Sequence, residues 1–100
     1  MIVLGQYDEF CPGMNLPKLS ECINNSPYPE KDRIVEYLKR GHIHAVTASP
    51  VIDVLTGMSA GFEKLFLDDG EYSWCNSLAY YVDKYNLRLD QEFERKVLAL

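Results

Sequence analysis

The residues best suited to metal binding or nucleophilic chemistry in this sequence are two histidines and three cysteines. His42 and His44 alternate in a segment rich in β-branched residues, so both rings are expected on one face of a strand. There they could hold a metal with a carboxylate or a cysteine as third ligand, but spacing fixes no such ligand. Cys11, Cys22 and Cys75 form no CxxC pair and no finger-type pairing with histidine. We therefore expect no metal site and no cofactor.

Catalysis has no local signature either. A thiol can be activated at a helix N-terminus, and Cys75 is expected at a strand-to-helix junction, but no base is placed beside it. Asp68 and Asp69 form a carboxylate pair at the expected tip of a turn, where solvation makes them poor general acids. The sequence contains no glycine-rich phosphate-binding motif. We expect that the chain is not an enzyme.

The distribution of charge favours a protein partner over a nucleic acid. The chain carries 10 basic and 15 acidic residues, a formal net charge of -5. Within residues 53–83, acidic residues are opposed by a single basic residue, Lys64. A surface of this kind repels phosphates, and it attracts and steers a basic protein. We therefore predict no binding to nucleic acid.

Aromatic side chains accompany these carboxylates. Tyr72 and Trp74 alternate on one expected strand, and Tyr80 lies off the apolar stripe of the helix that follows. Tyrosines beside acids are typical of protein-recognition surfaces, whereas we expect Trp74 to belong to the core. The predicted contact residues are Asp53, Glu63, Asp68, Asp69, Glu71, Tyr72, Tyr80 and Asp83. A second candidate surface is the N-terminal loop with Tyr7, Asp8, Glu9 and Phe10.

Proline, glycine and β-branched residues divide the chain into its expected elements. Proline at an expected first turn and Lys39-Arg40 before Gly41 predict a helix over about 30–40, and a shorter one is expected over about 17–24. Strands are predicted at 43–47, 51–56, 62–67 and 72–74, the first two separated by Ser49-Pro50. The Asp-Gly within residues 68–71 predicts a hairpin with a type I′ turn.

Two amphipathic segments close the sequence. Leu78, Tyr81, Val82 and Tyr85 form one helical stripe, with Asn76 or Ser77 as cap and Asn86 as the left-handed residue at its end. A last helix follows Asp90, with Phe93, Val97 and Leu100 on one face. The resulting expectation is one α+β domain over residues 1–100, in which helices pack on one face of a three- or four-stranded antiparallel meander.

The composition also indicates a compartment. The odd cysteine count without a disulfide framework indicates reduced thiols. No apolar run approaches the roughly 20 residues of a membrane span, and the N-terminal run is too short for a signal peptide. We expect a cytoplasmic protein without membrane contact, and the sequence leaves its oligomeric state open.

The stretches Asp69–Trp74, Leu78–Tyr85 and Leu87–Phe93 resemble a pattern of small bacterial immunity proteins from contact-dependent growth inhibition and related polymorphic toxin systems. The similarity is densest over about 56–95, and Cys75 and Asp90 replace prolines of that pattern. The resemblance implies a protein that binds and neutralises a cognate toxin domain, here expected to be a basic nuclease. It assigns no contact residue, since such residues diverge between systems.

Another interaction module, such as an antitoxin-like regulator or an adaptor, is the alternative expectation. A deep pocket walled by His42, His44 and a thiol would contradict both, because it would point to chemistry.

Overall fold

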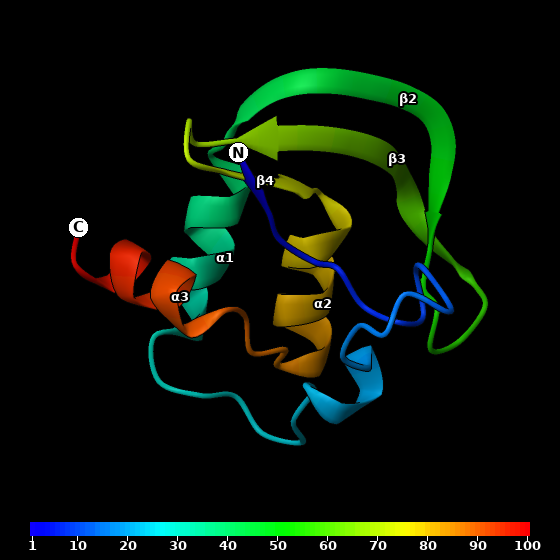
Figure 1. The fold of residues 1–100 in the computed structure, drawn as a ribbon, viewed down its shortest axis with the longest axis horizontal. Helices are drawn as coiled ribbons and strands as arrows, with labels where there is room; N and C mark the ends of the chain where they lie inside the picture. The colour runs from blue at the N-terminus through cyan, green and yellow to red at the C-terminus, as the bar shows by residue number, and fades with distance from the viewer.

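A four-stranded sheet and three α-helices make up the fold (Figure 1). The structure is a computed structural model that describes residues 1–100 without a gap. In chain order its elements are β1 (Ile2–Val3), the 3-10 helix η1 (Leu19–Glu21), α1 (Lys31–Lys39), β2 (His42–Ile52), β3 (Ser59–Asp68), β4 (Tyr72–Cys75), α2 (Ser77–Tyr85) and α3 (Gln91–Leu98). The chain is therefore an α+β protein, as the sequence predicts.

The sheet is mixed, with the strand order β1-β4-β3-β2. The neighbours β2 and β3, and β3 and β4, pair antiparallel, whereas β1 lies parallel to β4 with Ile2 opposite Tyr72. A parallel pair requires a long connection, and here α1 and the β2–β3 hairpin lie between the two strands in sequence. The sheet is therefore not antiparallel throughout, and β2 forms one of its edges.

The core lies between the sheet and the helices packed beneath it (Figure 1). The aromatic ring of Phe93 from α3 meets Tyr37, Tyr72 and Trp74 edge-on, with centroids 5.0 to 5.8 Å apart. Trp74 is 2% exposed, and its Nε1 donates to the Leu38 carbonyl at 3.0 Å. This satisfied polar tip confirms that Trp74 belongs to the core.

The helices follow the sequence pattern at most of their ends. Asp90 accepts from the backbone N–H groups of Glu92 and Phe93 and so caps α3, and Asn86 has φ 56° after α2. Asn76 does not cap α2. Its side chain instead donates to Glu63 O and accepts from Leu65 N, which ties the start of α2 to β3.

Two helical predictions are wrong in extent. The helix expected over 17–24 is reduced to the single turn η1, which buries Leu19. Leu100 was predicted on the buried face of the last helix, but α3 ends at Leu98 and Leu100 is 76% exposed.

The β2–β3 hairpin is long and strongly bent (Figure 1). Between the pairs Val46–Leu65 and Pro50–Glu63, β2 contains more residues than β3. Between Pro50–Glu63 and Ile52–Ser59, β3 contains the extra residues. Bulges of this kind bend a strand pair. The sequence predicts two strands separated at Ser49-Pro50, but one strand runs through Pro50. Proline has no N–H to donate, and an edge strand tolerates this because a backbone N–H on its outer side would have no partner strand.

The turn between β3 and β4 lies where the sequence predicts it, but its geometry differs. A type I′ turn needs positive φ at both central residues, and only Gly70, at φ 91°, has one. The Asp68 carboxylate accepts from the Gly70 N–H, and Asp69 accepts from the N–H groups of Glu71 and Tyr72. The turn is therefore stabilised by side-chain hydrogen bonds and does not have the expected type I′ backbone geometry.

None of the helices has both the length and the apolar character needed to cross a bilayer.

Gly41, which joins α1 to β2, provides a test of core packing. A Cβ at this position would lie 2.7 Å from Trp74 Cζ2 and 3.0 Å from Leu67 Cβ. We predict that Gly41→Ala lowers the free energy of unfolding by about 1–3 kcal/mol, because the tight contact outweighs the loss of unfolded-state entropy that alanine usually gives. Urea unfolding monitored by Trp74 fluorescence measures it, and a variant as stable as the parent would contradict the packing described.

Candidate functional site

Two of the predicted contact residues are buried. Asp53 is 1% exposed and Tyr72 is 5% exposed. The ring of Tyr72 packs against Phe93 in the core. Because a buried side chain cannot touch a partner in the folded protein, the prediction that Asp53 and Tyr72 belong to a contact surface is wrong.

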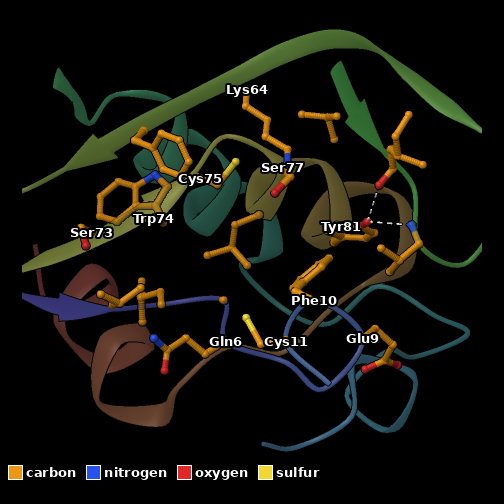
Figure 2. A pocket seen from close by; sticks show the side chains of 18 of the residues that line it. Gln6, Glu9, Phe10, Cys11, Lys64, Ser73, Trp74, Cys75, Ser77 and Tyr81 are labelled. Carbon is orange, nitrogen blue, oxygen red and sulfur yellow. Dashed lines mark hydrogen bonds between the residues drawn. The ribbon is translucent and has the colours of Figure 1, made fainter. Parts of the chain in front are cut away.

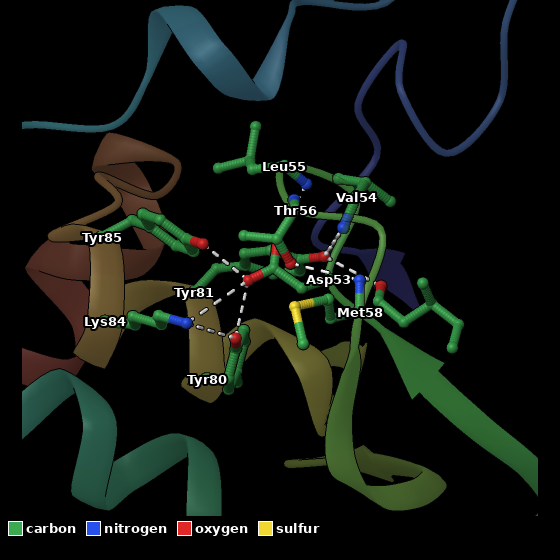
Figure 3. Close-up of polar contacts among 10 residues, drawn as sticks. Asp53, Val54, Leu55, Thr56, Met58, Tyr80, Tyr81, Lys84 and Tyr85 are labelled. Carbon is green, nitrogen blue, oxygen red and sulfur yellow. Dashed lines mark hydrogen bonds and ion pairs between the residues drawn. The ribbon is translucent and has the colours of Figure 1, made fainter.

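Asp53 instead pins the tip of the β2–β3 hairpin to α2 (Figure 3). Its Oδ2 accepts from the hydroxyls of Tyr80 and Tyr85, each at 2.6 Å. Its Oδ1 accepts from the backbone N–H groups of Leu55 and Thr56, at 2.8 and 3.3 Å. One carboxylate therefore closes the turn and attaches it to the helix.

Tyr81 adds a second attachment between the same elements. Its hydroxyl accepts from Val54 N at 3.0 Å and donates to the Ile52 carbonyl at 3.3 Å (Figure 3). The tyrosine is 1% exposed, so this bond lies at the boundary of the core. Three tyrosines of one helix thus hold a turn that is distant in sequence.

The electrostatics of Asp53 follow from these contacts. Burial by itself raises the pKa of this carboxyl, but the hydrogen bonds from Tyr80, Tyr85 and the backbone N–H groups of Leu55 and Thr56 together outweigh burial, so the pKa of Asp53 lies below its ordinary value. The hydrogen bond from the Tyr85 hydroxyl to Asp53 raises the pKa of Tyr85, since it favours the protonated hydroxyl. Lys84 Nζ lies 3.8 Å from Asp53 Oδ2 and partly neutralises the charge.

Asp69 is a second internal carboxylate. Its Oδ2 accepts from Tyr37 Oη at 2.6 Å and from Lys96 Nζ at 2.9 Å, so α1, α3 and the β3–β4 turn meet at one group. Burial raises the pKa of Asp69, but the bonds from Tyr37, from the backbone and from Lys96 outweigh it and hold the pKa far below the ordinary value. The side chain is 9% exposed, so the predicted solvated turn charge is wrong for Asp69.

Asp68 faces the two histidines. His44 Nδ1 lies 2.9 Å and His42 Nδ1 3.6 Å from Asp68 Oδ2, so both rings approach one carboxylate, as their alternation suggests. The Asp68 side chain is 15% exposed. No group of three or more His, Cys, Asp or Glu side chains is placed so as to hold a metal ion.

The remaining predicted contact residues lie on or near the surface. Glu63, Glu71 and Asp83 are exposed, and Glu71 is paired with Lys96 at 2.8 Å. Tyr80 is half-buried, since its ring packs against Phe62 and its hydroxyl bonds Asp53. The acidic face inferred from the sequence is therefore reduced mainly to Glu63 and Asp83.

Asp83 borders an apolar hollow of about 420 Å³, here called the helix-side groove, between the helices and the β2–β3 hairpin. Tyr80 also lines it, whereas Glu63 follows the lining residue Phe62 on β3 and is not itself part of the lining. Its lining consists of Leu38, Lys39, Ile43, Phe62, Leu65, Leu67, Asn76, Ala79, Tyr80 and Asp83. Two predicted contact residues are thus brought together on an apolar surface.

The edge strand β2 borders this groove. Ile43 is 49% exposed and Val46 70% exposed, and no lysine, arginine, aspartate or glutamate occurs between His42 and Ile52. Proteins usually protect an edge strand with charges, prolines or bulges. Here the register with β3 shifts between Ile43 and Ala45 and again on both sides of Pro50, so bulges interrupt the edge, but residues 42–46 are largely exposed and include no lysine, arginine, aspartate or glutamate.

A larger hollow of about 510 Å³, here called the outer groove, lies between the N-terminal segment, the strands and α2 (Figure 2). His44, Cys11 and Cys75 are among its lining residues, but His42 is not. Neither histidine forms a hydrogen bond with a thiol, and the Cys75 thiol donates to Asn76 Oδ1 at 3.4 Å. The hollow therefore differs from a pocket walled by His42, His44 and a thiol, because His42 lies outside it.

The N-terminal loop, predicted as a second contact surface, mainly builds structure. The Glu9 carboxylate accepts from Leu19 N at 2.7 Å and from Ser20 N at 3.0 Å, and Tyr7 is buried. Phe10 is exposed at the outer groove. Only the part of the loop around Phe10 is therefore open to a ligand.

Comparison with known protein families, curated proteins and solved structures gives no match.

The buried carboxylate gives the first testable prediction for this region. Asp53→Ala leaves two tyrosine hydroxyls and two backbone N–H groups without their acceptor, so we predict a loss of about 2–4 kcal/mol in the free energy of unfolding. Asp83→Ala is the matched control, because the Asp83 side chain is exposed and forms no hydrogen bond, and its loss should stay within about 0.5 kcal/mol. Urea unfolding measures both, and equal stabilities would contradict the pinned hairpin.

Asp69 gives a prediction on pH. Its pKa is lowered on folding, so its contribution to stability is fully present above the unfolded value of about 3.9 and is lost as the pH falls below it. Asp69→Asn should therefore be less stable than the parent near neutral pH, and the difference should shrink in acid. Unfolding midpoints across acidic and neutral pH measure this, with Asp83→Asn as control. A difference that stays constant with pH would show that the charge of Asp69 contributes nothing.

Proposed function

We propose that this chain is an immunity-type protein that binds a cognate bacterial toxin domain, expected to be a basic nuclease, and neutralises it in the cytoplasm. The observation that carries the proposal is the exposed edge of β2, which carries apolar side chains and no lysine, arginine, aspartate or glutamate, beside the helix-side groove. An exposed edge offers unpaired backbone groups to an extended segment of a partner. The groove beside it offers apolar surface for that partner's side chains.

The resemblance to immunity proteins supports the same proposal. Several residues of the resembling stretches are structural: Asp69 holds the β3–β4 turn, and Tyr72, Trp74 and Phe93 build the core. They therefore describe the fold rather than the contacts. This division is expected for proteins that share a scaffold and differ in the partner that they bind.

Charge supports a basic partner, although by fewer residues than the sequence suggests. The net charge of -5 gives long-range attraction to a basic domain and raises the rate of encounter. Glu63 and Asp83 are exposed and have no ion-pair partner within the chain, so they are available to cations of the partner. Fast capture suits an inhibitor that must bind a toxin before it acts.

The test is complex formation with the toxin domain encoded by the neighbouring gene, together with rescue of growth on co-expression. We predict that Glu63→Lys/Asp83→Lys weakens binding about tenfold at low salt, mainly through slower association, because exposed interface charges act by steering. The loss should diminish as salt rises, since salt screens exposed charges. Surface plasmon resonance at two salt concentrations measures both rates.

The control is Glu21→Lys/Glu92→Lys, which makes the same change in net charge at exposed residues outside both grooves. A second pair tests the apolar contact: Ile43→Ser should speed dissociation, whereas Met14→Ser, also at an exposed apolar residue, should not. No complex and no rescue with the neighbouring toxin would overturn the proposed function. Equal losses in test and control variants would place the interface elsewhere.

A further inference from the structure

The outer groove has the size and lining of a small-molecule site (Figure 2). Its volume of about 510 Å³ lies in the range usual for ligand pockets. Phe66 on β3 points to this side, opposite to Leu65 and Leu67, which face the helices, because side chains alternate along a strand. Phe10 and Val54, which are each 37% exposed, complete the apolar walls.

The charged groups that line the groove differ in how they are used. The Glu9 carboxylate is occupied by the N–H groups of Leu19 and Ser20. His44 is held against Asp68. Lys64 alone keeps its charge free.

Lys64 extends from β3 into the space above Cys75 and Ser77 in Figure 2. Its ammonium group forms no ion pair, whereas Lys84 and Lys96 each lie within 3.8 Å of a carboxylate. A free cation beside apolar walls selects an anion that also carries an apolar body.

One hydroxyl group adds to this selectivity. Ser77 lies beside Lys64 in Figure 2, whereas Ser73 pairs with Asp68, four residues along β3 from Lys64. The Ser77 hydroxyl can donate to an anionic oxygen. The groove thus combines apolar walls, one free cation and a hydroxyl beside it, which matches a carboxylate with a hydrocarbon tail.

We infer that the outer groove binds a small organic carboxylate with an apolar body, of the medium-chain or aromatic type, with its carboxylate at Lys64 and its body against the exposed side chains of Phe66, Phe10 and Val54. This site shares no lining residue with the helix-side groove, although His44 of the β2 edge also lines the outer groove. It exists whether or not the chain neutralises a toxin.

The experiment uses octanoate, octanol and octylammonium as probes of equal chain length, titrated into the whole chain and followed by amide chemical shifts in heteronuclear NMR. Octanoate should bind about tenfold more tightly than octanol, because one charge-assisted contact is added, and octylammonium should bind most weakly. The shifts should centre on residues that line the outer groove.

Two variants and a control refine the assignment. Lys64→Gln should abolish the preference for octanoate over octanol, whereas Lys39→Gln, at the helix-side groove, should keep it. Ser73→Phe should fill the groove and weaken all three probes, and thermal unfolding shows whether this variant remains folded. Equal binding of the three probes by the parent, shifts outside the groove, or no binding of octanoate at millimolar concentration would each overturn the inference.

Discussion

The hydrogen bonds of the Asp53 carboxylate fix the shape of this protein. A hairpin as long as β2–β3 does not bend back onto a helix because of local propensity alone, and its bulges only permit the bend. The two tyrosine hydroxyls at 2.6 Å hold the bent tip against α2. Because this bend brings the end of β2 over α2, the wall of the outer groove depends on it. One buried charge at the hairpin tip therefore determines a surface that extends far from it.

A buried carboxylate is costly unless its lone pairs are satisfied, and both internal aspartates meet this condition in the same way. Asp53 and Asp69 each combine backbone N–H groups from their own turn with a nearby lysine and with tyrosine hydroxyls from a helix, two at Asp53 and one at Asp69. The turn N–H groups are local and give the turn its form. The tyrosines are distant in sequence and give it its position. An aspartate carboxylate thus couples local structure to tertiary structure at each of the two turns, Asp53 at the β2–β3 turn and Asp69 at the β3–β4 turn.

The accuracy of sequence-based prediction follows this division between local and distant contacts. The helices α1 and α2, the cap at Asp90 and the hairpin at Gly70 were predictable because each depends on neighbours within a few residues. The parallel pairing of β1 and the passage of β2 through Pro50 were not, because strand order decides which N–H groups need partners. The sequence predicts Asp53 as a contact residue within a strand over 51–56 and Asp69 as a solvated turn residue, and only the distant tyrosines show that both are internal. The predicted contact surface therefore included two carboxylates that the structure shows to be internal.

The same division makes the proposed contact surface free to change. Ile43, Val46, Glu63 and Asp83 contribute exposed side chains, and none of those side chains takes part in the hydrogen bonds at Asp53 or Asp69. Substitutions there alter what a partner meets while the bend of the hairpin and the core are kept. A protein that must match one particular partner needs this separation, because specificity then changes without loss of stability. The internal carboxylates hold the scaffold from within, so the exposed side chains of the proposed contact surface take no part in these hydrogen bonds.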